Sequence, residues 1–120
     1  MAKPNPEELF NLGMLSYDKQ DFSKARKYFE KACGLNNGGG CSNLGVLYQN
    51  GQGVEKDLIK AAYLYSRACE LKDGWGCSFL GVLYYNGDGV KQDSKKAAAL
   101  FKKACKLGYK KACEMLKELR

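Results

Sequence analysis

The 120-residue chain contains no histidine, only two prolines, a single tryptophan and no long apolar run. The absence of histidine excludes the Ser-His and Cys-His mechanisms of nucleophilic catalysis and makes a catalytic zinc site hard to build. Both prolines lie at the irregular start, and Pro6 stands where the first turn of a helix tolerates proline. No segment has the apolar length that crosses a membrane, so we expect no membrane insertion.

Basic residues exceed acidic ones only in the last quarter of the chain. Residues 1–90 hold ten basic and ten acidic residues, whereas residues 91–120 hold ten and three, which accounts for the net charge of +7. The excess can mark a site for an acidic partner, but a solvated terminal helix of a repeat array explains it better. No nucleic-acid-binding motif accompanies the charge, so we expect no nucleic acid partner.

Six cysteines form three pairs, each with its members eight residues apart, and the pairs recur every 36 residues. This spacing does not fit zinc ligands, which are separated by about two to four residues, and we expect no metal and no cofactor. Each pair brackets a short turn between two predicted helices, where two Cβ atoms can meet. The placement favours three disulfides over six reduced core thiols: Cys33–Cys41, Cys69–Cys77 and Cys105–Cys113.

Disulfides indicate an oxidising compartment, so we expect a secreted or periplasmic protein. The opening Met-Ala-Lys-Pro-Asn-Pro contains no apolar leader segment. We therefore expect that a leader has been replaced by a start codon, or that the sequence is engineered.

Helical periodicity predicts seven helices, beginning with residues 7–18. Asp21, Asp57 and Asp93 are the expected N-caps of the second, fourth and sixth helices. Residues 35–40, which include three consecutive glycines, are expected to end the second helix. The third helix is expected to begin near Cys41. Residues 41–76 and 77–112 share 19 identities in 36 positions. This repetition predicts an all-α, right-handed α/α solenoid of helix hairpins, stapled by disulfides.

Glycine recurs in the middle of the first helix of each hairpin, where it costs about 1 kcal/mol relative to alanine. The recurrence predicts a close approach of the second helix. The glycines are Gly13, Gly45 and Gly81, and the small residues on the second helices that would permit this approach are Ala25, Ala61, Ala62, Ala97 and Ala98.

The pattern Leu-Gly-x-Leu-Tyr-x-Asn-Gly-x-Gly-Val, then Asp-x-x-Lys-Ala-Ala and Ala-Cys-x-Leu, resembles the Sel1-like repeat, a relative of the tetratricopeptide repeat with a longer loop. The cysteine spacing narrows the resemblance to the cysteine-rich branch, the Helicobacter cysteine-rich proteins. Gly13 and Gly45 are 32 rather than 36 residues apart, so the first hairpin is similar to a tetratricopeptide repeat. Members of the branch usually have more repeats, which leaves a shortened or engineered hybrid version open.

We predict a single repeat domain over residues 1–120. It comprises a tetratricopeptide-like hairpin at about 7–40, Sel1-like repeats at 41–76 and 77–112, and a C-terminal capping helix at 109–120.

The resemblance implies a binding scaffold whose concave groove recognises an extended peptide or protein segment, and we expect the protein to be a monomer. Two alternatives stay open: a penicillin-binding protein with weak β-lactamase activity, as described for the branch, and an engineered framework without a native ligand. Of the serine β-lactamase motifs, the chain contains only Ser-x-x-Lys, at Ser16 and Lys19, where turn chemistry at a helix end explains it. Enzyme activity is therefore not favoured.

By analogy with tetratricopeptide repeats, nine positions line the groove: Asn11, Met14, Asn43, Val46, Gln49, Phe79, Val82, Tyr85 and Asn86. An Asn side chain can pair with both the N–H and the C=O of a peptide backbone. Packing between hairpins is the alternative for the apolar members, and exposure to solvent is the alternative for Asn43. We assign Tyr48 and Tyr84 to the core. Trp75, placed in the turn between paired cysteines, is expected to pack on the disulfide or to anchor a partner.

Overall fold

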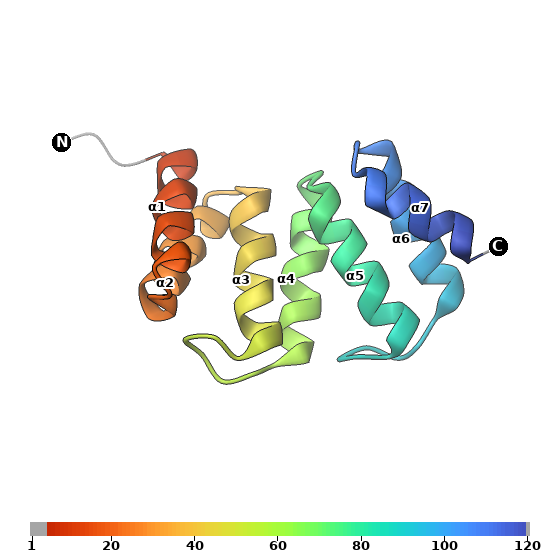
Figure 1. The fold of residues 1–120 in the computed structure, drawn as a ribbon, viewed down its shortest axis with the longest axis horizontal. Helices are drawn as coiled ribbons and strands as arrows, with labels where there is room; N and C mark the ends of the chain where they lie inside the picture. Colours follow the sequence, from red (N-terminus) through yellow and green to blue (C-terminus); the bar gives the residue numbers. More distant parts are fainter. Residues whose placement is uncertain (1–4, 120) are drawn as a thin grey trace.

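The computed structural model describes residues 5–119, which form seven helices and no strand (Figure 1). The helices are α1 (Pro6–Asp18), α2 (Phe22–Gly34), α3 (Gly38–Asn50), α4 (Leu58–Glu70), α5 (Gly74–Asn86), α6 (Ser94–Lys106) and α7 (Lys110–Glu118). Three hairpins, α1–α2, α3–α4 and α5–α6, stack in chain order, and α7 packs on α6. The predicted all-α solenoid is confirmed. Residues 1–4 and 120 of the predicted domain lie outside the described residues.

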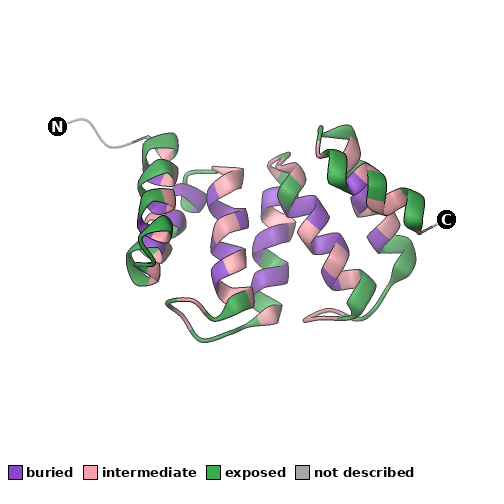
Figure 2. Ribbon diagram, viewed as in Figure 1, coloured by how far each residue is buried: buried purple, intermediate pink, exposed green. Residues whose placement is uncertain are grey.

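The stack is elongated, with extents of 51 × 28 × 21 Å. Its buried residues run along the facing sides of successive helices, and the exposed ones lie on the outer turns and loops (Figure 2). None of the helices in residues 5–119 is long and apolar enough to cross a membrane.

Asn or Asp side chains cap six of the seven helices by accepting a hydrogen bond from a backbone N–H of the first turn. The caps are Asn5, Asp21, Asn37, Asp57, Asp73 and Asp93. The three caps predicted from the sequence are among them. Tyr109, before α7, makes no side-chain cap bond.

The glycines before Cys41 are not part of a non-helical segment as predicted, because Gly38, Gly39 and Gly40 form the first turn of α3. A Cβ on Gly40 would lie 2.7 Å from the Cβ of Ala32 on α2. Glycine at this position therefore lets α3 begin directly against the end of α2. The missing side chain, rather than freedom of the backbone, is what the packing requires here.

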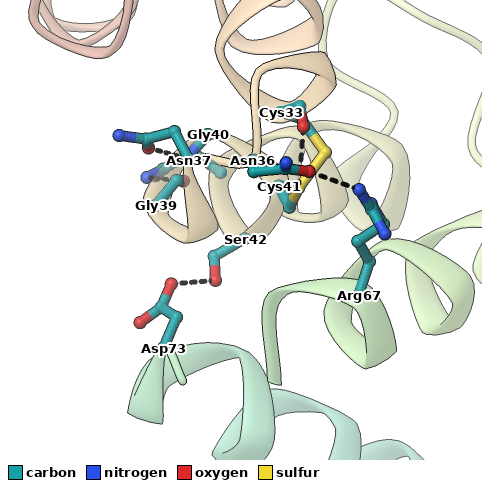
Figure 3. Close-up of a disulfide and its surroundings, with 10 residues drawn as sticks. Cys33, Asn36, Asn37, Gly39, Gly40, Cys41, Ser42, Arg67 and Asp73 are labelled. Atoms are coloured by element: carbon teal, nitrogen blue, oxygen red, sulfur yellow. Dashed lines mark hydrogen bonds between the residues drawn. A yellow bond between two sulfur atoms is a disulfide. The ribbon is translucent and has the colours of Figure 1, made fainter. Parts of the chain in front are cut away.

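Three disulfides join each hairpin to the helix that follows it. The pairs have Cα–Cα distances between 4.5 and 4.8 Å and follow the predicted pairing: Cys33–Cys41, Cys69–Cys77 and Cys105–Cys113. The first bridge connects α2 to α3, and Arg67 of α4 donates a hydrogen bond to Asn36 in the adjacent turn (Figure 3). Each bridge thus fastens the joint between consecutive repeats.

Inside each hairpin, a glycine of the first helix packs against an aromatic ring of the second. A Cβ on Gly45 of α3 would lie 2.6 Å from the ring of Tyr65 on α4. Gly13 meets Phe29, and Gly81 meets Phe101, in the same way. The predicted close approach is therefore correct, but its partner is a buried ring rather than the alanines named above.

We expect Gly45→Ala to lower the free energy of unfolding by about 1–2 kcal/mol, because the added methyl group must displace the buried Tyr65 ring. Urea denaturation of the oxidised protein measures the change. Gly34→Ala is the matched control, since a Cβ there meets nothing within 4 Å, and we expect no loss. Equal stability of the two variants would contradict the assigned role of the contact.

Candidate functional site

The first helices of the three hairpins, α1, α3 and α5, border a hollow of about 290 Å³. We call it the α1–α3–α5 hollow. Its lining residues are Phe10, Met14, Gly39, Ser42, Asn43, Asp73, Trp75 and Phe79. Three of the predicted groove residues, Met14, Asn43 and Phe79, are therefore brought together from three different helices.

Asp73 ties two of these helices together. One carboxylate oxygen caps α5 by accepting the backbone N–H of Trp75. The other accepts the hydroxyl of Ser42 on α3, and Figure 3 shows this second bond. Both interactions hold the carboxylate at the wall of the hollow, and the N-terminus of α5 favours its negative charge.

Aromatic rings continue the wall from Asp73. Trp75 lies in the first turn of α5 rather than in a turn between helices, and its side chain is 55% exposed. Its ring packs against Phe79 at a centroid distance of 5.6 Å and against Tyr109 at 5.0 Å. Phe79 in turn meets the buried ring of Tyr65 at 5.2 Å. The exposed tryptophan thus rests on aromatic neighbours, which fix its orientation.

Asn43 lies half-buried in the hollow and makes a hydrogen bond within its own helix. Its side-chain N–H donates to the carbonyl oxygen of Gly39 at 2.9 Å. This bond orients the amide and leaves its carbonyl oxygen as the atom that a bound peptide N–H can reach.

Two predicted groove residues serve packing, Gln49 within its own hairpin and Val46 also against the next one. Gln49 accepts the hydroxyl of Tyr65, whose ring is buried. Burial raises the pKa of the Tyr65 hydroxyl above its ordinary value, so it stays a hydrogen-bond donor. Val46 packs partly buried against the core cluster that contains Tyr65 and Leu80.

Val82 and Tyr85 border a second hollow, of about 280 Å³, between α5 and the C-terminal helix α7. Met115 of α7 and Leu119, the residue that follows α7, contribute to its apolar wall. The remaining predicted residues, Asn11 and Asn86, are exposed and line neither hollow. The nine predicted positions therefore do not all line one hollow. Three line the α1–α3–α5 hollow, two line the second hollow, two pack against the core and two are exposed.

The two tyrosines assigned to the core lie at its edge. Tyr48 and Tyr84 are partly buried against the core clusters, and the ammonium groups of Lys60 and Lys96 lie 4.8 and 4.7 Å from their ring centroids. A lysine of the following helix therefore covers each ring.

Ser16, the serine of the Ser-x-x-Lys match, is buried and donates its hydroxyl hydrogen to the carbonyl of Leu12 at 2.9 Å. Lys19 is the exposed residue that ends α1. The hydroxyl is therefore engaged with its own helix, and Ser16 and Lys19 line a separate, smaller hollow of about 150 Å³ between α1 and α2.

The Sel1 repeat matches residues 39–73 and 76–109, and the tetratricopeptide repeat matches residues 6–38. HcpC of Helicobacter pylori is 60% identical over 58 residues, which cover 48% of this chain and 20% of HcpC. Beta-lactamase HcpA of the same organism is 53% identical over 58 residues, which cover 48% of this chain and 23% of HcpA. These matches thus extend over about a fifth of the length of the curated relatives.

Among solved structures, Helicobacter pylori cysteine rich protein B (HcpB) is 49% identical and superposes with a TM-score of 0.74. The match covers 82% of this chain and 71% of HcpB. The likeness therefore extends over most of both chains, in sequence as well as in fold.

We expect Tyr65→Phe to lower the free energy of unfolding by about 1 kcal/mol, because it removes the hydrogen bond to Gln49 while keeping the ring. Tyr63→Phe is the control, since Tyr63 lies on the same helix and is 66% exposed. Thermal unfolding followed by circular dichroism compares the two. A Tyr65→Phe variant as stable as the control would show that Gln49 is free for other roles.

Proposed function

Because the chain belongs to the Sel1 repeat family, in its cysteine-rich branch, we propose that it is a scaffold that binds an extended peptide or protein segment in its concave groove. The groove is the face made by α1, α3 and α5. The observation that carries the proposal is the α1–α3–α5 hollow, where half-exposed aromatic surface and oriented polar groups lie together on a disulfide-fixed frame.

The composition of the hollow suits an extended segment better than a compact small molecule. Met14 and Phe79 supply apolar surface, and Asn43 offers a carbonyl oxygen to a backbone N–H. Towards α7, Val82 and Tyr85 border the second hollow, so apolar surface recurs farther along the stack. A chain lying across successive first helices would use both hollows through alternate side chains.

We infer that the protein is a monomer in a secreted or periplasmic setting. The disulfides support an extracytoplasmic location, because the cytosol keeps thiols reduced. All six cysteines are paired in these three disulfides, each of which links two consecutive helices.

The name of HcpA makes β-lactam hydrolysis the alternative function. In this chain the alternative is supported by the Ser-x-x-Lys motif at Ser16 and Lys19. However, the Ser16 hydroxyl already donates a hydrogen bond to the carbonyl oxygen of Leu12. The disulfide-bonded cysteines supply no thiolate nucleophile. Binding without hydrolysis is therefore the function we favour.

Selection from a phage-displayed library of linear peptides of about ten residues, roughly 33 Å long when extended, tests the binding proposal. We expect selected peptides to change the fluorescence of Trp75, the single tryptophan. We also expect Trp75→Ala to weaken their affinity about tenfold or more, as the loss of an aromatic anchor does.

Tyr63→Ala is the matched control for this experiment, because it removes an exposed aromatic residue of α4 that lines neither hollow. Its affinity should stay within about twofold of the parent chain. Selected peptides that bind both variants equally, or a library that yields no binder, would refute the groove as the binding site.

We expect the protein to show no nitrocefin hydrolysis that depends on Ser16. The rate with Ser16→Ala should equal that of the parent chain, and both should equal the rate of the buffer. Hydrolysis by the parent that is lost in the folded Ser16→Ala variant would establish the alternative function instead.

A further inference from the structure

The face made by the first helices differs in charge from the rest of the chain. None of the 20 lysines and arginines falls within α1, α3 or α5. The basic residues of the described chain lie instead on α2, α4, α6, α7 and the connecting loops. The charges within the three first helices and at their N-caps are all negative: Glu7, Glu8, Asp18 and Asp73.

Asp73 is the charged residue that lines the α1–α3–α5 hollow. Its carboxylate is held by two neutral donors, the Ser42 hydroxyl and the Trp75 backbone N–H. Within residues 5–119 the one ion pair is Arg26 with Glu30, on α2. The negative charge of Asp73 is therefore fixed in place at the wall of a hollow and is not neutralised by a basic side chain of the described residues.

The helix frame does not require this charge. The residues equivalent to Asp73 in the 36-residue repeat are Asn37, whose amide oxygen caps α3, and Tyr109, which precedes α7. An asparagine would meet the capping requirement of α5 as well as an aspartate does. The cap of α5 therefore does not by itself require a negative charge at residue 73, and the second carboxylate oxygen is held at the wall of the hollow by the Ser42 hydroxyl.

From these observations we infer that the hollow seats a basic side chain of the bound segment, with arginine preferred, its guanidinium group on the Asp73 carboxylate and its plane against Trp75. Arginine suits this site because its planar group pairs with a carboxylate and stacks on an aromatic face. The inference rests on the proposed function and names the class of its partner: a segment with a net positive charge. An acidic segment would place like charges together without a basic group on these three helices to offset them.

Three capped pentapeptides that differ at their central residue test the inference: acetyl-Gly-Leu-Xaa-Leu-Gly-amide, with Xaa as arginine, glutamine or glutamate. Each is titrated into the oxidised, isotope-labelled full chain, and the shifts of the Trp75 indole N–H and of the Asn43 and Phe79 amides are followed by NMR. We expect the arginine peptide to bind about fivefold more tightly than the glutamine peptide, the effect of one partly screened charge pair. The glutamate peptide should bind most weakly.

Asp73→Asn should remove the preference for arginine while keeping the N-cap of α5. Asp93→Asn is the matched control, because it removes one negative charge at the N-cap of α6, outside the hollow, and the preference should survive there. Circular dichroism checks that both variants keep the parent helix content.

Equal affinity of the three peptides, or an arginine preference that persists in Asp73→Asn, would overturn the basic-side-chain site and leave the groove intact. Absence of binding by all three peptides would also overturn it. The selection from the peptide library tests the proposed binding function separately, because a selected peptide need not contain a basic residue.

Discussion

The contact between a glycine and an aromatic ring sets the geometry on which the other features depend. Gly45 lies so close to the ring of Tyr65 that a single methyl group does not fit between them. The two helices of a hairpin are therefore held at one separation, and the Tyr65 hydroxyl then reaches Gln49. Because the outer hairpins repeat the contact with phenylalanine, successive first helices share one spacing relative to their partners.

The disulfides and the caps turn this spacing into a stack. The Cys69–Cys77 bridge fastens α4 to α5, and Asp73, in the turn that the bridge encloses, caps α5 and holds Ser42 of α3. The same turn thus joins three helices and forms one wall of the hollow. Closing a short loop by a disulfide stabilises the fold by about 2–3 kcal/mol on the chain-entropy model. Here it also fixes the orientation of a candidate binding surface.

The 36-residue period made the solenoid and its disulfides predictable, because identical spacing of Cys, Gly and Ala has few other structural explanations. The period did not reveal that Gly38–Gly40 form a helical turn, since a run of glycines usually ends a helix. Here the Asn37 cap and the close packing of Gly40 on Ala32 support the turn. The role of Gln49 in packing was hidden for a similar reason. Its face of α3 was predictable, but its hydrogen bond to Tyr65 depends on a contact between helices.

The cysteines and mid-helix glycines that build the frame are the same in each repeat, whereas several positions that line the hollows differ. The first turn of the first helix carries Gly39 in one repeat, Trp75 in the next and Lys111 in α7, and one turn later Asn43 is replaced by Phe79. A frame fixed by cysteine, glycine and alanine tolerates such variation, because none of the variable side chains closes a hairpin or a joint. Specificity can therefore change from repeat to repeat without a cost in stability. That separation explains why the charged and aromatic groups proposed to select the partner occur at one hollow, around Asp73, rather than at every repeat.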